Sequence, residues 1–312
     1  MNWKIKSAIQ NGVASLPSGV SYELYYWIQR RFGNLKVFNP EPRLGTGVWI
    51  WNLISSLDQN PSDKVFLEVG TGRAPIVPLS LWLLGAKKTY TYDANPYLKL
   101  ELIRESLRHI QSNHEQIRSI YGEQLMDERF ESLSEFSKSK RYSIDDFLQH
   151  TQIEYVAPGD ASDTGLTPDS IDYHISYTVF EHVPPSILRS ILREGARIIK
   201  KDGLFIHRID YSDHFSHSDK KISAANFLKY SDSEWEKLAG NRYMYMNRLR
   251  HDDYIELFTS NSIKPVSVYP TEDKRSLRLL QSGEITPDNR FHEKTNETLS
   301  IRGASIIARK EP

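Results

Sequence analysis

Histidine and aspartate residues gather in one short stretch of the chain, between residues 207 and 217. His207, Asp210 and His214 in this stretch, and His182 in an earlier loop, are our candidates for catalysis. An imidazole titrates near neutral pH, so histidine suits the removal of a proton from a hydroxyl group. Imidazole and carboxylate are also ligands of divalent metals, which could use the same atoms. We predict proton transfer, and a divalent metal remains possible but is not favoured.

Two glycines follow a short apolar segment earlier in the chain. Val65 to Val69 is too short for a helix and suits a buried strand that carries Glu68 near its end. Gly70 and Gly72 come directly after it. Glycine can adopt positive φ and lets a ligand approach the backbone. A helix is expected over 76–84, so the order is strand, glycine turn and helix, which is typical of a nucleotide-binding α/β unit.

Acidic residues stand at the ends of the next two predicted strands. Asp93 ends the strand expected over 87–95 and lies 21 residues beyond Gly72, the position of a ribose-binding acid in such units. The alternative is that Asp93 only caps a helix near Pro96. Asp160 follows the strand expected over 153–157 and is placed to accept a hydrogen bond from the amine of a base.

Further strands alternate with helices, which predicts a parallel sheet with right-handed crossovers. We expect the fourth strand at 170–179, a helix at 186–200, a turn at 201–203 and the fifth strand at 204–209. The resulting fold class is α/β, with helices on both faces of the sheet. No linker divides the chain, so we predict a single domain over 1–312, made of 1–63, 64–209, 210–260 and 261–312.

Segments outside this core are expected to be mainly helical. The N-terminal segment 1–63 should form helices at 22–32 and 46–57 around a turn-rich 39–47, and we interpret it as a cover of the sheet. A lid or a membrane-resting helix is the alternative. Residues 98–110 and 115–136 should be helical, and 270–299 irregular, with a role in oligomer contacts. A helix should begin at Ser231, because Glu234 completes a capping box.

Composition excludes several classes of function. Lys plus Arg and Asp plus Glu both number 40, so the net charge is zero and lacks the basic footprint of a nucleic-acid-binding protein. No cysteine is present, which excludes disulfides and thiolate chemistry. No apolar run approaches the ~20 residues of a membrane span. We expect a cytoplasmic enzyme that has no transmembrane segment, with peripheral membrane contact and oligomer formation possible.

The combination of motifs resembles the class I S-adenosylmethionine-dependent methyltransferases, in particular bacterial enzymes that methylate small molecules and glycans. The resemblance covers residues 65–209 and rests on four motifs, in this order: Glu68-Val-Gly-Thr-Gly72, Tyr92-Asp-Ala94, Gly159-Asp-Ala161 and Ser176-Tyr-Thr-Val-Phe-Glu-His-Val183. The third glycine of the family is Ala74 here. The resemblance implies a Rossmann-like sheet of seven strands, with a sixth strand over 263–269 and a seventh over 300–308 pairing antiparallel.

The resemblance also implies which residues hold the donor, S-adenosylmethionine. They are Glu68, Gly70, Thr71, Gly72, Asp93, Ala94, Asp160, Ala161 and Tyr177. Gly70 and Gly72 would let backbone groups approach the methionine part, with Glu68 fixing their turn. Asp93 would hold the ribose hydroxyls, and Ala94 would lie against the adenine. Asp160 and Ala161 would read the adenine edge, and Tyr177 would lie beside the sulfonium.

For the acceptor we expect a hydroxyl of a small molecule or of a glycan intermediate, with a histidine as general base. Aromatic and polar residues in the 210–260 insertion could bind it: Tyr245, Asn247, Arg248 and Arg250. These residues could equally form a packed segment. An N- or C-methyltransferase acting on another metabolite, or a non-catalytic donor-binding module, remains an alternative. A dehydrogenase is disfavoured because its catalytic residues are not found.

Overall fold

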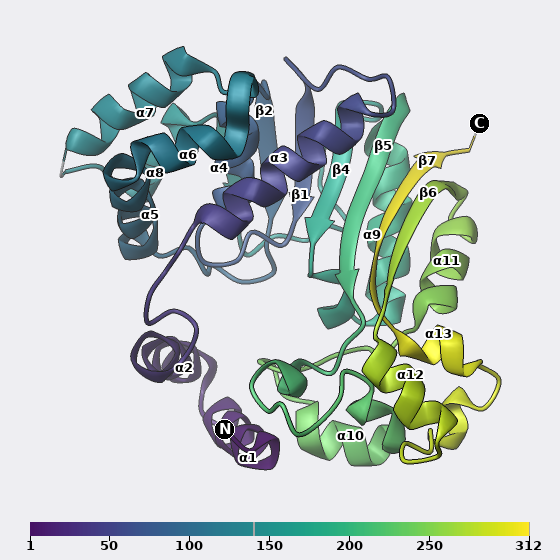
Figure 1. Cartoon of the computed structure of the whole chain (residues 1–312). Helices are drawn as coiled ribbons and strands as arrows, with labels where there is room; N and C mark the ends of the chain where they lie inside the picture. Colours follow the sequence, from purple (N-terminus) through teal and green to yellow (C-terminus); the bar gives the residue numbers. More distant parts are fainter. Residues whose placement is uncertain (140, 312) are drawn as a thin grey trace. The chain divides into compact units, whose positions relative to one another are not determined.

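The computed structural model describes residues 1–139 and 141–311. These residues form two compact units, each assembled from separate chain segments (Figure 1). Unit 1 contains 1–36, 176–193 and 207–311, and unit 2 contains 37–175 and 194–206. The expected divisions at residues 63, 209 and 260 are not unit boundaries. The assignment of the whole chain to one domain stays a prediction.

Seven strands form one mostly parallel, Rossmann-like sheet in the order β3-β2-β1-β4-β5-β7-β6. The pairs β1–β2, β1–β4 and β2–β3 are parallel, and β6–β7 is antiparallel as predicted. The strand order reverses at β1 and β4, and such a reversal is where open α/β sheets bind ligands. The strands are β1 (Val65–Val69), β2 (Lys88–Tyr92), β3 (Ile153–Val156), β4 (Ile171–Tyr177), β5 (Ile199–Asp210), β6 (Ile263–Glu272) and β7 (Ile301–Lys310).

Helices connect the strands and supply most of the remaining structure. The α-helices are α1 (Trp3–Ala14), α2 (Ser18–Phe32), α3 (Glu41–Ser55), α4 (Ile76–Leu83), α5 (Leu100–Ser112), α6 (His114–Tyr121), α7 (Asp127–Lys138), α8 (Ile144–His150), α9 (Pro185–Ile198), α10 (Asp232–Ala239), α11 (His251–Thr259), α12 (Lys274–Gln281) and α13 (Asn296–Ser300). The 3₁₀ turns are η1 (Gly122–Gln124), η2 (Phe180–His182), η3 (His214–His217), η4 (Asn226–Lys229) and η5 (Asn289–Phe291).

In unit 2 the helix α4 follows the glycine turn and is buried along its whole length. Helix α3, drawn in front of β1 in Figure 1, packs closely on α4. Gly47 makes this approach possible, since a Cβ atom there would lie 2.4 Å from the Ser80 side chain. Ser80 Oγ donates to the carbonyl of Leu44 at 2.7 Å. The close packing fixes the helix that begins beside the glycine turn.

Unit 1 has its own aromatic core. Trp3 of α1 is 5% exposed and packs with Phe215 and with Trp235 of α10. The backbone N–H of Trp3 donates to Asp219 Oδ2 at 3.0 Å. The capping box predicted for α10 is present, with Ser231 Oγ accepting from the Glu234 N–H. The helices of the expected N-terminal cover are therefore divided between the units: α1 and α2 belong to unit 1, and α3 belongs to unit 2.

Three secondary-structure predictions were wrong in position or extent. The turn-rich 39–47 is mostly helical, because α3 begins at Glu41 with Pro42 in its first turn, where a missing N–H costs nothing. The helix expected over 115–136 is broken at Gly122, which has a φ of 58°. The segment 270–299 is not irregular, since it contains α12 and α13.

One strand prediction also needs correction. The turn expected at 201–203 is absorbed into β5, which begins at Ile199. Gly203 permits this backbone path, because a Cβ atom there would lie 2.5 Å from Ile199 Cγ1 and 2.7 Å from the Asp172 carbonyl oxygen. The strand ends at Asp210, one residue beyond the expected end at residue 209. Over the described residues, no helix is both long and apolar enough to cross a membrane.

Candidate active site

The glycine turn after β1 meets the end of β2. Gly70 and Gly72 have φ values of 86° and 69°, in the left-handed region that favours glycine. The Gly70 N–H donates to the Tyr92 carbonyl at 2.8 Å. The Gly72 N–H donates to Asp93 Oδ2 at 2.9 Å, and the Asn95 N–H donates to Oδ1 at 3.0 Å. The carboxylate of Asp93 therefore lies directly beside the glycine turn and does not cap a helix, since α5 begins only at Leu100.

Glu68 lies beneath this turn in a chain of side-chain hydrogen bonds. Its side chain is buried, and Thr91 Oγ1 donates to Glu68 Oε2 at 2.7 Å. The hydroxyls of Thr71 and Thr91 are 2.5 Å apart. Burial raises the pKa of the Glu68 carboxyl to about 7, and the Thr91 hydroxyl and the charge of Arg43 only partly offset this rise. These bonds tie the turn to β1 and β2.

We expect the Glu68→Gln variant to lose part of the pH dependence of stability. The folded pKa of about 7 lies above the ordinary value of 4.5, so the folded chain holds a proton that the unfolded chain has released. This stabilisation is complete below about pH 4.5 and is lost as the pH rises through about 7. Between these limits the free energy of unfolding should fall by about 3 kcal/mol more in the parent than in the variant.

Urea unfolding followed from pH 4.5 to 8 measures this difference. The matched control is Glu115→Gln, whose side chain is 94% exposed in the same unit and should leave the slope unchanged. If the free energy of unfolding changes with pH in the same way in the parent and in Glu68→Gln, the raised pKa of the Glu68 carboxyl is wrong.

The third donor segment lies after β3 and is joined to Asp93 through the backbone. The Asp93 N–H donates to the Val156 carbonyl at 3.1 Å, and the Gly159 N–H donates to the Asp93 carbonyl at 2.9 Å. Asp160 is exposed, and its Oδ1 accepts from the Ser162 N–H at 2.8 Å. Ala94 is also exposed, whereas Ala161 is buried. The structure thus brings the segments after β1, β2 and β3 together in unit 2.

In unit 1, Asp210 lies between two histidines. Its Oδ2 atom is 3.5 Å from His214 Nε2 and 3.5 Å from His217 Nε2. The two imidazole rings stack with centroids 4.9 Å apart, and His217 Nε2 also lies 3.0 Å from Ser212 Oγ. Burial alone would raise the pKa of the Asp210 carboxyl, but His214 and Ser212 outweigh it and lower the pKa. A carboxylate in this place can stabilise an imidazolium beside it.

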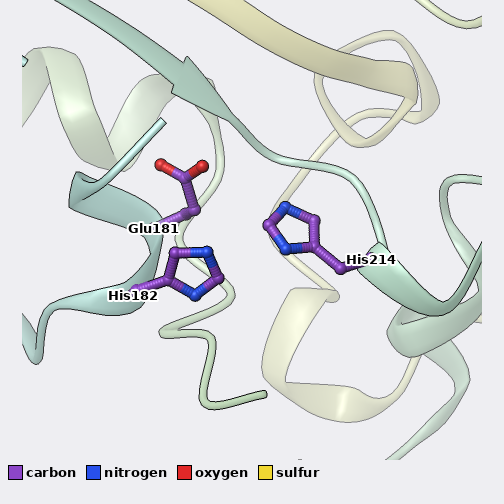
Figure 2. A group of neighbouring side chains, drawn as sticks. All are labelled: Glu181, His182 and His214. Carbon is purple, nitrogen blue, oxygen red and sulfur yellow. The ribbon is translucent and has the colours of Figure 1, made fainter. Parts of the chain in front are cut away.

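His182 approaches the same cluster from η2. Figure 2 shows its imidazole facing that of His214, which comes from a different segment of the chain. The ring centroids are 4.8 Å apart, and His182 Nδ1 lies 2.8 Å from the carbonyl oxygen of Tyr245. The side chain is exposed at the surface, yet the packing around its ring and the charge of His214 lower its pKa. His182 is therefore neutral at pH 7.

Glu181 is a member of this cluster that the sequence analysis did not select, although the Glu-His-Val motif contains it. Its side chain is 2% exposed, and neither carboxylate oxygen has a hydrogen-bond partner among the described residues. Burial raises the pKa of this carboxyl well above its ordinary value, and the nearby backbone N–H groups of Glu181 and Asp210 offset this only in part. The Glu181 carboxyl beside His182 therefore holds a proton more readily than an ordinary glutamate does.

The structure separates His207 from the other candidates. Its side chain is fully buried, and its Nδ1 atom lies 2.7 Å from Ser176 Oγ. Its ring stacks on Phe180 with centroids 4.3 Å apart and meets Phe258 edge-on. These surroundings give His207 a packing role and no access to an acceptor.

Three of the four residues expected to bind the acceptor instead hold the insertion together. Asn247 Nδ2 donates to the carbonyls of Phe180 and Val183 at 2.8 and 2.9 Å. Arg248 donates to the Tyr230 carbonyl at 2.6 Å, and burial lowers its pKa. Arg250 is 2% exposed and donates to three backbone carbonyls on two segments of the chain, and burial lowers its pKa to about 10. The correction follows from burial, because a buried guanidinium must use its donors internally.

Comparison with known proteins assigns the chain to a class of enzyme. Residues 131–207 match the family model described as methyltransferase domain, a segment that contains β3, β4 and most of β5. The chain is therefore an S-adenosylmethionine-dependent methyltransferase. The matched segment includes Asp160 and His182. It does not include the glycine turn or His214. No curated protein matches the methyltransferase.

Solved structures resemble the methyltransferase at low sequence identity. A SAM-dependent methyltransferase from Methanosarcina mazei is 15% identical, with 83% of this chain and 97% of that chain covered and a TM-score of 0.44. Geranyl diphosphate C-methyltransferase from Streptomyces coelicolor A3(2) is 10% identical, with 85% and 78% covered and a TM-score of 0.45.

Within residues 1–139 and 141–311, two sets of side chains are close enough to share a cation. Glu181, His182 and His214 form one set (Figure 2), and Asp210, His214 and His217 form the other. In each set the candidate ligand atoms lie within 4.8 Å of one another. Imidazole and carboxylate fit Mn²⁺ or Zn²⁺. Proton transfer by the same histidine and carboxylate side chains requires no cation.

A cavity of about 410 Å³ in unit 1 adjoins the cluster. Tyr177, Asp210 and His217 line it, so the residue expected beside the sulfonium and the histidine cluster border one space. Its wall also contains basic residues that the sequence analysis missed: Arg208, Lys220, Arg275 and Arg302. Thr178 lines it with a φ of 54°, a strained conformation for a β-branched residue of the kind found at functional sites.

Proposed function

We propose that the methyltransferase transfers the methyl group of S-adenosylmethionine to a hydroxyl oxygen of a small molecule or glycan intermediate. In this reaction the oxygen attacks the methyl carbon, the new C–O bond forms, and the C–S bond breaks to leave a thioether. The sulfonium is already a strong electrophile. The protein must therefore align the hydroxyl in line with the C–S bond and remove its proton.

The observation that supports a histidine base is the Asp210 carboxylate, placed 3.5 Å from the Nε2 atoms of both His214 and His217. A histidine that takes up a proton becomes a cation, and a neighbouring carboxylate stabilises it. We assign the base to His214, the histidine that contacts both Asp210 and His182. Asp210 positions this imidazole, and His182 packs edge-on against it.

For the donor, we propose the roles that the geometry of unit 2 supports. The Asp93 carboxylate, held beside the Gly72 N–H, binds the ribose hydroxyls. The open space above Gly72, where a Cβ atom would meet no other atom within 4 Å, accommodates the methionine part. Asp160 and Ala161 contact the adenine edge. Cytoplasmic location, peripheral membrane contact and oligomer formation stay predictions.

Transfer of a labelled methyl group tests the proposed reaction. The purified chain would be incubated with methyl-labelled S-adenosylmethionine and panels of sugars, sugar phosphates, phenols and primary amines, and the products identified by mass spectrometry. We expect label in a methyl ether. Label found only on nitrogen or carbon would replace O-methylation by one of the alternative reactions. Donor binding without transfer to any member of the panels would favour a non-catalytic module.

A further inference from the structure

We propose that the cavity in unit 1 binds an acceptor that carries a phosphate group beside its hydroxyl. The inference rests on the proposed O-methylation and names the substrate class of that same site. Four basic side chains, those of Arg208, Lys220, Arg275 and Arg302, meet at the wall of one cavity of about 410 Å³. This volume is within the usual range for a site that encloses a small molecule.

The contacts of two of these cations, Arg208 and Arg275, leave their charge available to a ligand. Arg208 donates to the hydroxyls of Ser305 and Thr271 at 3.3 and 3.4 Å, both long bonds to neutral oxygens. Arg275 donates to the carbonyls of Lys220, Lys221 and Ile222 at 3.0 to 3.3 Å. These carbonyl bonds orient the Arg275 guanidinium without neutralising it. An arginine so held is well suited to recognise the oxygens of a phosphate.

Charge balance favours a dianion over a carboxylate. Two acids, Asp210 and Asp273, line the cavity with the four cations, so about two positive charges remain uncompensated. Asp210 is already engaged with His214 and His217, and Asp273 caps α12 through the Ser276 N–H. A phosphate monoester carries about −1.5 to −2 at pH 7 and matches this excess.

The position of the cavity points to an acceptor site. Tyr177 ends β4 and Asp210 ends β5, so the cavity lies at the carboxyl ends of two neighbouring strands, where ligands of α/β sheets bind. Asp210 also positions the proposed base, His214. A phosphate on the basic wall would therefore hold the acceptor close to the group that removes its proton.

Ligand-induced stabilisation of the full chain tests the proposal. The midpoint of thermal unfolding would be measured with inorganic phosphate against chloride at equal ionic strength, and with glucose 6-phosphate against glucose. We expect phosphate and glucose 6-phosphate to raise the midpoint and glucose to have no effect. Arg302→Gln should weaken phosphate binding at least about tenfold, as the loss of one charge-assisted bond predicts. Arg208→Gln should do the same.

The matched control is Arg278→Gln, which removes an equal charge from an exposed position on α12 outside the cavity wall. The proposal is overturned if the parent binds phosphate no better than chloride, or if Arg278→Gln weakens binding as much as Arg302→Gln. Glucose 6-phosphate binding tighter than inorganic phosphate supports a phosphorylated acceptor. Equal affinity would indicate a free phosphate site and overturn the substrate assignment.

The labelling experiment separates this inference from the proposed function. If the chain forms methyl ethers on neutral sugars but does not bind phosphate, the proposed O-methylation is supported and the phosphate site is wrong. If phosphate binding depends on Arg302 but label is found only on nitrogen, the phosphate site is supported and the proposed O-methylation is wrong.

Discussion

Replacing Asp93 by alanine should raise the dissociation constant for S-adenosylmethionine by about 100-fold or more. Its carboxylate stands beside the glycine turn with one oxygen on the Gly72 N–H and the other on the Asn95 N–H. Each hydrogen bond from a ribose hydroxyl to a charged carboxylate contributes about 1.5–3 kcal/mol, so losing two is a large effect. The variant also frees the Gly72 N–H and loosens the turn. Titration calorimetry with the donor measures the change.

The control for this variant is Asp145→Ala, which removes an exposed acid from α8 in the same unit and should bind the donor like the parent. Asp93→Asn keeps one acceptor and should fall between the two. Thermal unfolding confirms that each variant is folded. If Asp93→Ala binds the donor as tightly as the parent does, another residue holds the ribose.

Replacing His214 by asparagine should lower kcat by about 100-fold or more while donor affinity stays unchanged, because general bases contribute factors of this size. His214 belongs to unit 1, and the proposed donor residues Asp93 and Gly72 belong to unit 2. Asp210→Asn should cause a smaller loss, since it removes only the stabilising charge. The measurement is steady-state transfer to the acceptor found in the labelling experiment.

His292→Asn is the matched control, since this histidine directly after η5 is 71% exposed and should keep full activity. Partial recovery of a His214→Gly variant by added imidazole would identify a lost base, which a purely structural role does not predict. Activity that disappears with EDTA and returns with Mn²⁺ would instead assign the cluster to a metal. Full turnover in His214→Asn would exclude this base.

Much of the donor site could be predicted from the sequence because it depends on local chain geometry. Gly70, Gly72 and Asp93 each follow a short buried strand, and parallel pairing of β1 with β2 brings the strand ends together. Because β1 and β2 are neighbours in the sheet, the residues that follow them lie side by side. Side-chain contacts such as the Thr71–Thr91–Glu68 chain are not visible in the sequence, since they depend on strand register.

The histidine cluster was only partly predictable because clustering in sequence does not give side-chain direction. Successive side chains on a strand point to opposite faces, so Arg208 and Asp210 share one face of β5 while His207 faces the other. This alternation could have separated His207 from Asp210 and selected Arg208 without a structure. His217 and Arg302 come close to Asp210 only through the fold of unit 1.

The insertion residues show why residue type is a weak guide to binding. Asn247, Arg248 and Arg250 carry many hydrogen-bond donors, and an insertion that is poor in regular structure needs such donors to satisfy its backbone carbonyls. Arg250 alone bonds to the carbonyls of Tyr211, Leu299 and Ile301. Only burial distinguishes this use of an arginine from ligand binding.

The long-range position of Trp3 has a consequence for synthesis of the chain on the ribosome. Unit 2 can form once residues 37–206 have been made, whereas Trp3 finds Asp219 only after 216 further residues. Until Trp235 emerges, α1 has no aromatic core to join. Contacts this distant in sequence form slowly, and an unpartnered amphipathic helix is open to wrong partners meanwhile. Unit 2 should therefore fold first, and α1 should be among the last elements to be packed, although it precedes unit 2 in the chain.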